Sequence, residues 1–231
     1  MGSRSTKAVY LNGGRKEMAM TDTFDLIEKG PFMRIPEGIL VVTTGYGRRI
    51  PGNYDSIPEI RAHAIGAVET LGIGDFTLLD IGGQDYKVVR VEKGGIRDFF
   101  MNDKCAAGTG RFLEKMADML CLGVEELGAR KGSRKLLEST CSVFSETEII
   151  GMKMEGFTTE EIAEGVIYSV YERIRPLLRS FPTDRIVFTG GVSAFSGLKD
   201  TISDQIGVEV IVPENAQYMG ALGCARAVIR R

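Results

Sequence analysis

The sequence predicts an α/β fold made of two similar halves, and two patterns carry this prediction. Apolar segments typical of strands alternate with segments of helical periodicity. Glycine-rich turns follow several of these strands, where a backbone could approach a ligand closely. The chain has 231 residues, of which 43 % are hydrophobic, so it can bury one large core or two smaller ones.

An internal repeat relates the two halves. Residues 2–11 resemble residues 82–91 at a constant offset of 82 − 2 = 80, which places Lys7 on Lys87. Each copy has a small, polar turn followed by an apolar strand. The repeat predicts that one strand–turn–strand hairpin is used once in each half.

The second copy of the hairpin has a strand that the first lacks. The apolar strand Phe76–Ile81 precedes the second turn and carries Asp80 near its end. The equivalent carboxylate of the first copy would fall one residue before Met1. We therefore expect the first lobe to be N-terminally abridged.

The other elements follow from periodicity and helix-capping signals. We expect strands at Ile39–Thr44, Ile96–Met101, Arg185–Thr189 and Val208–Val212. We expect helices at the capping boxes Ser56-x-x-Glu59, Ser145-x-x-Glu148 and Thr158-x-x-Glu161, from about 106–110 to Leu120, and over Met219–Ile229.

Composition narrows the class of protein. The net charge is 29 − 31 = −2, so no basic face for nucleic acid is expected. The longest purely apolar run is about Ile39–Val42, far short of the roughly 20 residues of a membrane span. The N-terminus lacks a signal-peptide pattern. We expect a cytoplasmic protein that binds neither nucleic acid nor membrane.

Two glycine turns are candidates for a nucleotide site. They are Asp80-Ile-Gly-Gly-Gln-Asp85 and Thr189-Gly-Gly-Val192. Backbone N–H groups of such turns can cradle phosphate oxygens. Asp80 could hold Mg²⁺ through water or orient an attacking water. The alternative is a tight hairpin in which the glycines only supply unusual dihedral angles. Neither turn is a P-loop.

Cys105 and Cys141 each precede a predicted helix. A helix N-terminus lowers the pKa of a thiol and favours anionic ligands. Both thiolates could face one anionic centre such as a four-thiolate cluster, and a symmetric dimer would supply the second pair. The alternative is that they are small buried residues. We expect Cys121 and Cys224 in the core, and His63, the only histidine, to be structural.

Six motifs, in chain order, together resemble one family. They are Thr44-Gly-Tyr-Gly-Arg48, Asp80–Asp85, Met101-Asn-Asp-Lys-Cys-Ala-Ala-Gly-Thr-Gly-Arg111, Ser139-Thr-Cys-x-Val-Phe-x-Glu-x-Glu148, Thr189–Val192 and Ala216-Gln-x-x-Gly-Ala-Leu-Gly223. The chain resembles the activators of 2-hydroxyacyl-CoA dehydratases, a family that includes the ATPase subunits of benzoyl-CoA reductase.

The resemblance implies an actin/Hsp70/sugar-kinase fold, with two ribonuclease-H-like lobes and ATP between them. We expect an abridged first lobe over residues 1–75. A second lobe with cluster-binding helices covers residues 76–215, and the C-terminal helix, 216–231, returns to the first lobe. The family's first loop begins Asp-x-Gly, and here Met1 occupies its middle position. Either the start is assigned too late or ATPase activity is weakened.

The resemblance also implies roles for individual residues. Asp80 and Gln84 would be catalytic, with Asp80 organising Mg²⁺ and water. The residues expected to bind ATP or ADP are Gly2, Ser3, Thr6, Lys7, Gly82, Gly83, Gly190, Gly191, Gln217 and Gly220. Cys105 and Cys141 would bind one [4Fe-4S] cluster per homodimer.

The implied activity is that of an ATP-dependent activator that passes a low-potential electron to a partner. The partner would be a 2-hydroxyacyl-CoA dehydratase, a benzoyl-CoA reductase or a similar iron–sulfur protein, and the electron donor a ferredoxin or flavodoxin. Two alternatives stay open. One is a small-molecule acyl or sugar kinase of the same fold, and the other is a non-catalytic remnant that binds only nucleotide or partner.

Overall fold

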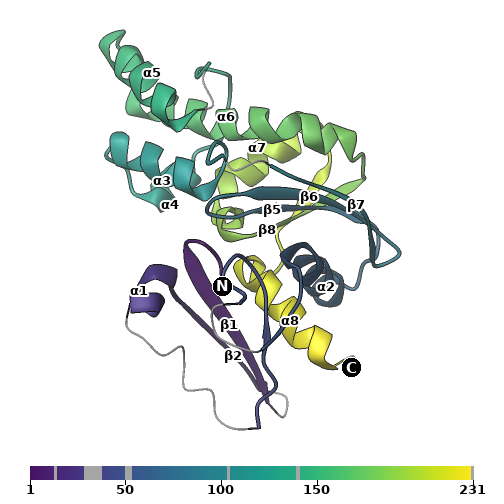
Figure 1. Ribbon diagram of the computed structural model, residues 1–231. Coiled ribbons are helices and arrows are strands. Elements are labelled where there is room, and N and C mark those ends of the chain that lie inside the picture. Colours follow the sequence, from purple (N-terminus) through teal and green to yellow (C-terminus); the bar gives the residue numbers. More distant parts are fainter. Residues whose placement is uncertain (13–14, 29–37, 50–53, 103–104, 139–140, 230–231) are drawn as a thin grey trace.

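The computed structural model describes residues 1–12, 15–28, 38–49, 54–102, 105–138 and 141–229. Its largest sheet has five strands in the order β7–β6–β5–β8–β9 (Figure 1). These strands are β5 (Phe76–Ile81), β6 (Tyr86–Glu92), β7 (Gly95–Met101), β8 (Arg185–Thr189) and β9 (Glu209–Ile211). Because β5 and β8 are parallel neighbours with Asp80 opposite Thr189, the two predicted glycine turns leave the sheet side by side.

Helices cover both faces of this sheet, which explains the continuous apolar runs of its central strands. Alternate residues of β5 enter separate cores: Leu78 packs with helices α2 (Glu59–Leu71) and α8 (Met219–Ile229), and Leu79 faces the opposite side. That opposite layer contains α3 (Gly110–Met119), α4 (Val124–Gly128), α6 (Thr159–Ser180) and α7 (Ser196–Ile206). Helix α5 (Ser142–Met154) packs outside it, against α3 and α6 (Figure 1).

The N-terminal part is smaller. Strands β1 (Ser5–Asn12) and β2 (Arg15–Asp22) form an antiparallel hairpin, and β3 (Val42–Thr43) pairs with β4 (Asp55–Ser56). Helix α1 (Thr23–Glu28) follows β2, and β1 lies beside α8 (Figure 1). Helix α8 also packs along α2, so the C-terminal helix contacts elements on both sides of the molecule. The lobe boundaries at 75 and 215 stay predictions.

The repeat detected in the sequence has a counterpart in the backbone. The N–H of Gly2 donates to the carbonyl of Ser5 at 3.2 Å, and the N–H of Gly82 donates to that of Asp85 at 2.8 Å. These pairs are related by the offset of 80, and in both copies the strand that follows pairs antiparallel with the next one. Strand β6 also pairs with β5, whereas β1 pairs only with β2 among the described residues.

Several predicted elements are confirmed. Strands β5 and β8 and helix α8 have the predicted bounds. Thr158 and Glu161 form a reciprocal capping box at the start of α6. Helix α6 continues through Pro176 to Ser180.

Other element predictions are wrong. Ser56 lies in β4, and α2 begins at Glu59 after Pro58 without a side-chain cap. Helix α5 begins at Ser142, so Ser145 lies inside its first turn rather than capping it. Of the predicted buried strand 39–44, only Val42–Thr43 is a strand and Leu40 is 78 % exposed. Among the described residues, only β4 pairs with that segment, and the pairing is limited to Val42–Thr43.

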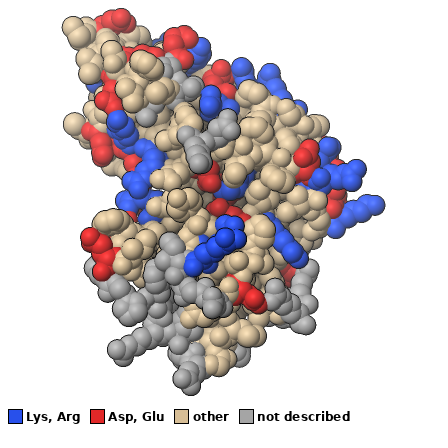
Figure 2. Space-filling model, viewed as in Figure 1, with Lys and Arg blue, Asp and Glu red and all other residues tan. Residues whose placement is uncertain are grey.

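No helix in the described part of the chain is both long and apolar enough to cross a membrane. On the face drawn in Figure 2, basic and acidic side chains are interspersed rather than separated into patches of one sign.

Candidate nucleotide cleft and cysteine pair

A cavity of about 1070 Å³ separates the β1–β2 hairpin and α8 from the end of the large sheet. All twelve residues predicted to bind nucleotide or act on it line this cavity: Gly2, Ser3, Thr6, Lys7, Asp80, Gly82, Gly83, Gln84, Gly190, Gly191, Gln217 and Gly220. Cys105 and Cys141 are not among its lining residues. The structure therefore brings the predicted nucleotide residues together and leaves both cysteines outside the cleft.

A second pair of glycines, Gly45 and Gly190, also has matching local structure in the two halves of the chain. Gly45 and Gly190 both have a left-handed backbone, with φ of 86° and 89°. A Cβ at Gly190 would lie 2.4 Å from the carbonyl oxygen of Ile81, and one at Gly45 would lie 2.5 Å from that of Met1. Only glycine fits such contacts. Each follows a threonine, which is the signal in the sequence that could have revealed this repeat.

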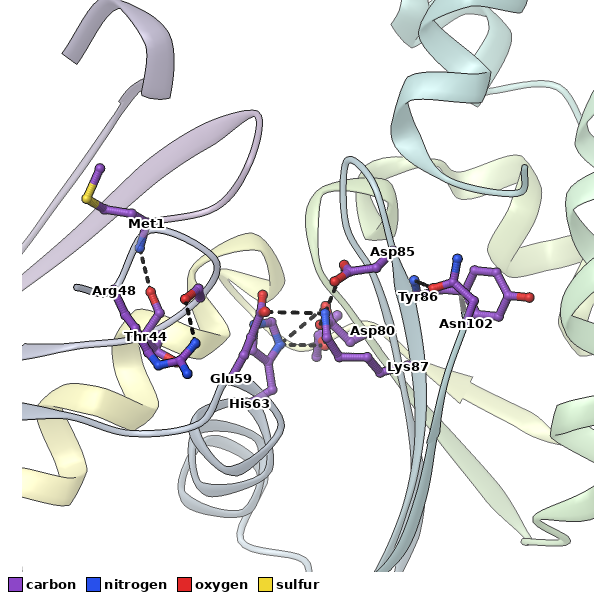
Figure 3. Close-up of polar contacts among 12 residues, drawn as sticks. Met1, Thr44, Arg48, Glu59, His63, Asp80, Asp85, Tyr86, Lys87 and Asn102 are labelled. Atoms are coloured by element: carbon purple, nitrogen blue, oxygen red, sulfur yellow. Dashed lines mark hydrogen bonds and ion pairs between the residues drawn. The ribbon is translucent and has the colours of Figure 1, made fainter. Parts of the chain in front are cut away.

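Asp80 is the centre of a buried polar network (Figure 3). His63 Nδ1 lies 3.3 Å from Asp80 Oδ1 and 3.1 Å from Thr189 Oγ1, and Lys87 Nζ lies 3.5 Å from Asp80 Oδ2. Burial alone would raise the pKa of Asp80, but electrostatic interactions with His63 and Lys87 outweigh it and hold that pKa below its ordinary value. Asp80 is thus an ionised carboxylate with fixed neighbours.

Lys87 compensates three carboxylates. Its Nζ lies 2.9 Å from Asp85, 3.4 Å from Glu59 and 3.5 Å from Asp80. Burial alone would lower the pKa of Lys87, yet these three charges raise it above the ordinary value. The ligand atoms of Glu59, His63 and Asp80 lie within 4.8 Å of one another, as in a metal site. The Lys87 ammonium lies within 3.5 Å of the Glu59 and Asp80 carboxylates, so it links them in one ion network.

Lys7 occupies the equivalent position in the first copy. Its Nζ donates to Ser5 Oγ at 2.8 Å, as Lys87 does to Asp85 two residues before it. Burial lowers the pKa of Lys7, against weaker opposing effects of Asp80 and Glu59. Within the described residues Lys7 forms no ion pair, although the carboxylates of Asp80 and Glu59 are near enough to favour its charged form.

Sequence reasoning missed the contribution of α2. His63 was expected to be only structural, but its ring contacts Asp80 in the cleft wall. Glu59 and His63 are four residues apart on one helix, so they share a face. Gly220 provides the space for this ring, because a Cβ there would lie 2.7 Å from His63 Nε2. That contact gives Gly220 a packing role besides the predicted nucleotide role.

The two candidate cluster ligands differ in their local structure. Cys141 is the exposed N-cap of α5, and backbone N–H groups of Phe144 and Val143 lower the pKa of its thiol. Cys105 is exposed but is not at a helix N-terminus, contrary to the prediction. A turn with Gly108 at φ 75° intervenes, and Thr109 is the N-cap of α3.

The remaining cysteines give one correct and one wrong prediction. Cys224 is buried in α8 as expected, and burial raises the pKa of its thiol to about 12. Cys121 is exposed rather than part of the core. Helix α3 ends at Met119 and the chain turns at Cys121 with φ 56°, which carries that side chain away from the apolar face.

Known proteins with similar sequences identify the family. A sequence model of the BadF/BadG/BcrA/BcrD ATPase family matches residues 34–227. The chain belongs to this ATPase family. The (R)-2-hydroxyglutaryl-CoA dehydratase activating ATPase of Acidaminococcus fermentans is 35 % identical, with 97 % of this chain and 93 % of the relative aligned. The activator of lactoyl-CoA dehydratase of Anaerotignum propionicum is 37 % identical, over 97 % and 93 % of the two chains. A benzoyl-CoA reductase subunit of Thauera aromatica is 31 % identical, over 80 % and 69 %.

Solved structures place this member of the family in the predicted fold class. The Clostridium difficile activator of 2-hydroxyisocaproyl-CoA dehydratase, solved with bound ADPNP, superposes with a TM-score of 0.86 at 35 % identity, covering 100 % of this chain and 92 % of the other. MreB 5 of Spiroplasma citri, at 14 % identity, gives a TM-score of 0.57 over 95 % and 81 % of the chains and shows the fold alone. The predicted actin/Hsp70-like α/β fold is confirmed.

The environments of the thiols predict an order of chemical reactivity among the cysteines. Cys141 has a lowered pKa, so its thiolate persists at lower pH than an ordinary thiol, whereas Cys224 is buried with a raised pKa. We expect iodoacetamide at pH 7 to label Cys141 in the folded, cluster-free protein and to leave Cys224 unlabelled. Peptide mass spectrometry across pH 6–9 measures this order. Equal labelling of both residues in folded protein would contradict it.

Proposed function

We propose that this ATPase is an activator that couples ATP hydrolysis to the transfer of one low-potential electron from an interfacial [4Fe-4S] cluster to a CoA-ester dehydratase or reductase. One observation carries the proposal. Every predicted nucleotide residue lines the cleft, whereas Cys105 and Cys141 are exposed outside it. The printed names of relatives, which are dehydratase activators and a benzoyl-CoA reductase subunit, support it.

The cleft residues fit a nucleotide triphosphate with Mg²⁺. Two glycine turns line the cleft, where backbone N–H groups not used within the turns could bind phosphate oxygens, and Lys7 lines the cleft beside them. Asp80 supplies ionised oxygen atoms, the donor type that Mg²⁺ prefers. When bound, Mg²⁺ would neutralise charge on the phosphates. His63 and Lys87 hold Asp80 in one orientation, from which it can position an attacking water.

The cysteines fit a shared cluster. Cys141 and Cys105 are exposed on one chain, so two symmetric chains would supply four thiolates. Helix α5, which Cys141 caps, exposes four large apolar side chains that a second copy would cover: Val143, Phe144, Ile150 and Met154. When bound, the cluster would supply one-electron redox chemistry, and a ferredoxin or flavodoxin would reload it.

Anaerobic reconstitution with iron and sulfide tests this assignment. We expect one [4Fe-4S] cluster per two chains, measured by iron and sulfide content, absorbance and sedimentation. Cys105→Ser and Cys141→Ser should each abolish stable cluster binding, because a cubane needs thiolate ligands. The matched control is Cys121→Ser, since Cys121 is also exposed but lies outside the proposed set.

The same preparation separates the proposal from the kinase of the same fold. A kinase would transfer phosphate to a small acceptor and would not require Cys105. A Cys105→Ser or Cys141→Ser protein that keeps a full cluster would contradict the proposed ligand set.

A further inference from the structure

We propose that the side chain of Asn102 transmits the nucleotide state of the cleft to Cys105. The inference rests on the proposed function, and it assigns a positioning role to one residue of the chain. Asn102 directly follows β7 and is 8 % exposed.

Asn102 connects the phosphate turn to the cysteine through three hydrogen bonds. The side-chain Oδ1 of Asn102 accepts from the backbone N–H of Tyr86 at 2.7 Å, and the backbone N–H of Asn102 donates to the carbonyl of Tyr86 at 3.1 Å. Its Nδ2 donates to the carbonyl of Cys105 at 3.0 Å. Tyr86 is the first residue of β6, immediately after the turn Gly82–Asp85 (Figure 3). One buried amide therefore joins the end of the turn to the backbone of Cys105.

A second set of bonds ties the same turn to the start of α3. The N–H groups of Gly110 and Arg111 donate to the carbonyls of Gly82 and Gly83, each at 2.9 Å. The hydroxyl of Thr109, which donates to the Ala106 carbonyl at 2.6 Å, also lies 3.1 Å from the Gly83 carbonyl. The segment that follows Cys105 is thus held by the phosphate turn as well.

Peptide planarity makes these bonds sensitive to a bound phosphate. The carbonyl of Gly82 and the N–H of Gly83 belong to one rigid plane, as do the carbonyl of Gly83 and the N–H of Gln84. If phosphate oxygens reorient these N–H groups, the carbonyls that hold Gly110 and Arg111 must reorient too. The turn, the start of α3 and Cys105 then respond as one hydrogen-bonded unit.

Within this unit Asn102 provides the side-chain connection to Cys105, while the links to α3 are mostly main-chain bonds. Asn102→Asp separates its two contacts, because a carboxylate still accepts from Tyr86 but cannot donate to the Cys105 carbonyl. In Asn102→Ser the side chain is too short to bond the Cys105 carbonyl, and no buried charge is introduced. This second variant provides the test if Asn102→Asp does not fold.

Alkylation of Cys105 in cluster-free protein measures the transmission. Iodoacetamide labelling is followed by peptide mass spectrometry with no nucleotide, with MgADP and with Mg-AMPPNP, and Cys121 in the same chain is the internal reference. In the unaltered chain we expect the Cys105/Cys121 rate ratio to differ by at least about fivefold between nucleotide states, the lower end of typical allosteric coupling. In Asn102→Asp and Asn102→Ser we expect a ratio that nucleotide no longer changes.

Two further readouts separate the possible failures. Nucleotide affinity, measured by isothermal titration, should stay within about threefold of the unaltered chain, a change of less than 1 kcal/mol. Asp98→Asn, an exposed change on the same strand, should keep the full response. Loss of nucleotide binding by the unaltered chain would overturn the proposed function. Binding without any response of Cys105, or an undiminished response in a folded Asn102 variant, would overturn only the role of Asn102.

Discussion

Asp80→Asn is expected to reduce ATP turnover at saturating ATP by roughly 100- to 1000-fold, the range seen when one preorganised electrostatic group is lost from an active site. Asp80 is 2 % exposed at the end of β5, and its carboxylate is held by His63, Thr189 and Lys87. The amide keeps the shape but loses the charge that would orient Mg²⁺ and water. Steady-state phosphate release at several ATP concentrations measures the change in kcat.

The control for Asp80→Asn is Asp98→Asn, which makes the same chemical change on the exposed edge strand β7. It should leave kcat unchanged. Binding of ATP analogues should weaken much less than turnover in Asp80→Asn, because the glycine turns and Lys7 stay in place. A loss confined to KM, with kcat intact, would contradict the catalytic role of Asp80.

Gly223→Ala is expected to lower the free energy of unfolding by about 1–3 kcal/mol, the usual cost of overpacking a core. A Cβ at Gly223 would lie 1.8 Å from the carbonyl oxygen of Ala62 and 3.0 Å from the nitrogen of Gly66. Helices α2 and α8 therefore meet backbone to backbone, and a methyl group must push them apart. Denaturant unfolding of the cluster-free protein measures the change.

The matched control is Gly151→Ala in α5, where a Cβ would meet nothing within 4 Å. Alanine is the better helix former by up to about 1 kcal/mol, so this variant should unfold at equal or higher denaturant. Equal stability of Gly223→Ala and the unaltered chain would show that α2 and α8 do not pack this closely in solution.

The sequence predicts best those elements whose local pattern and tertiary environment agree. Strands β5 and β8 are buried on both faces, so their apolar runs mark them directly. The Thr158–Glu161 box is a local signal and is confirmed. The box at Ser56 has the same spacing but fails, because Ser56 is already paired in β4.

The candidate site is predictable where a motif carries its own chemistry. The glycine turns and Asp80 are visible in the sequence because strand ends and phosphate turns have a recognisable composition. Glu59 and His63 are not, since their i, i+4 spacing shows only that they share a helix face. Contact with Asp80 depends on how α2 packs on the sheet, which is a tertiary fact. The prediction that Cys105 lies at a helix N-terminus is wrong for a local reason, because Gly108, with a left-handed backbone, lies between Cys105 and α3.

The central claim is that ATP drives electron transfer from a cluster held by Cys105 and Cys141. The most direct measurement is anaerobic stopped-flow transfer from the reduced, cluster-loaded protein to an oxidised low-potential viologen dye, with and without MgATP. We predict about one electron per cluster, released at least about tenfold faster with MgATP, which is a coupling within the ordinary allosteric range. Equal rates with and without MgATP, in a preparation that binds and hydrolyses ATP, would contradict the account.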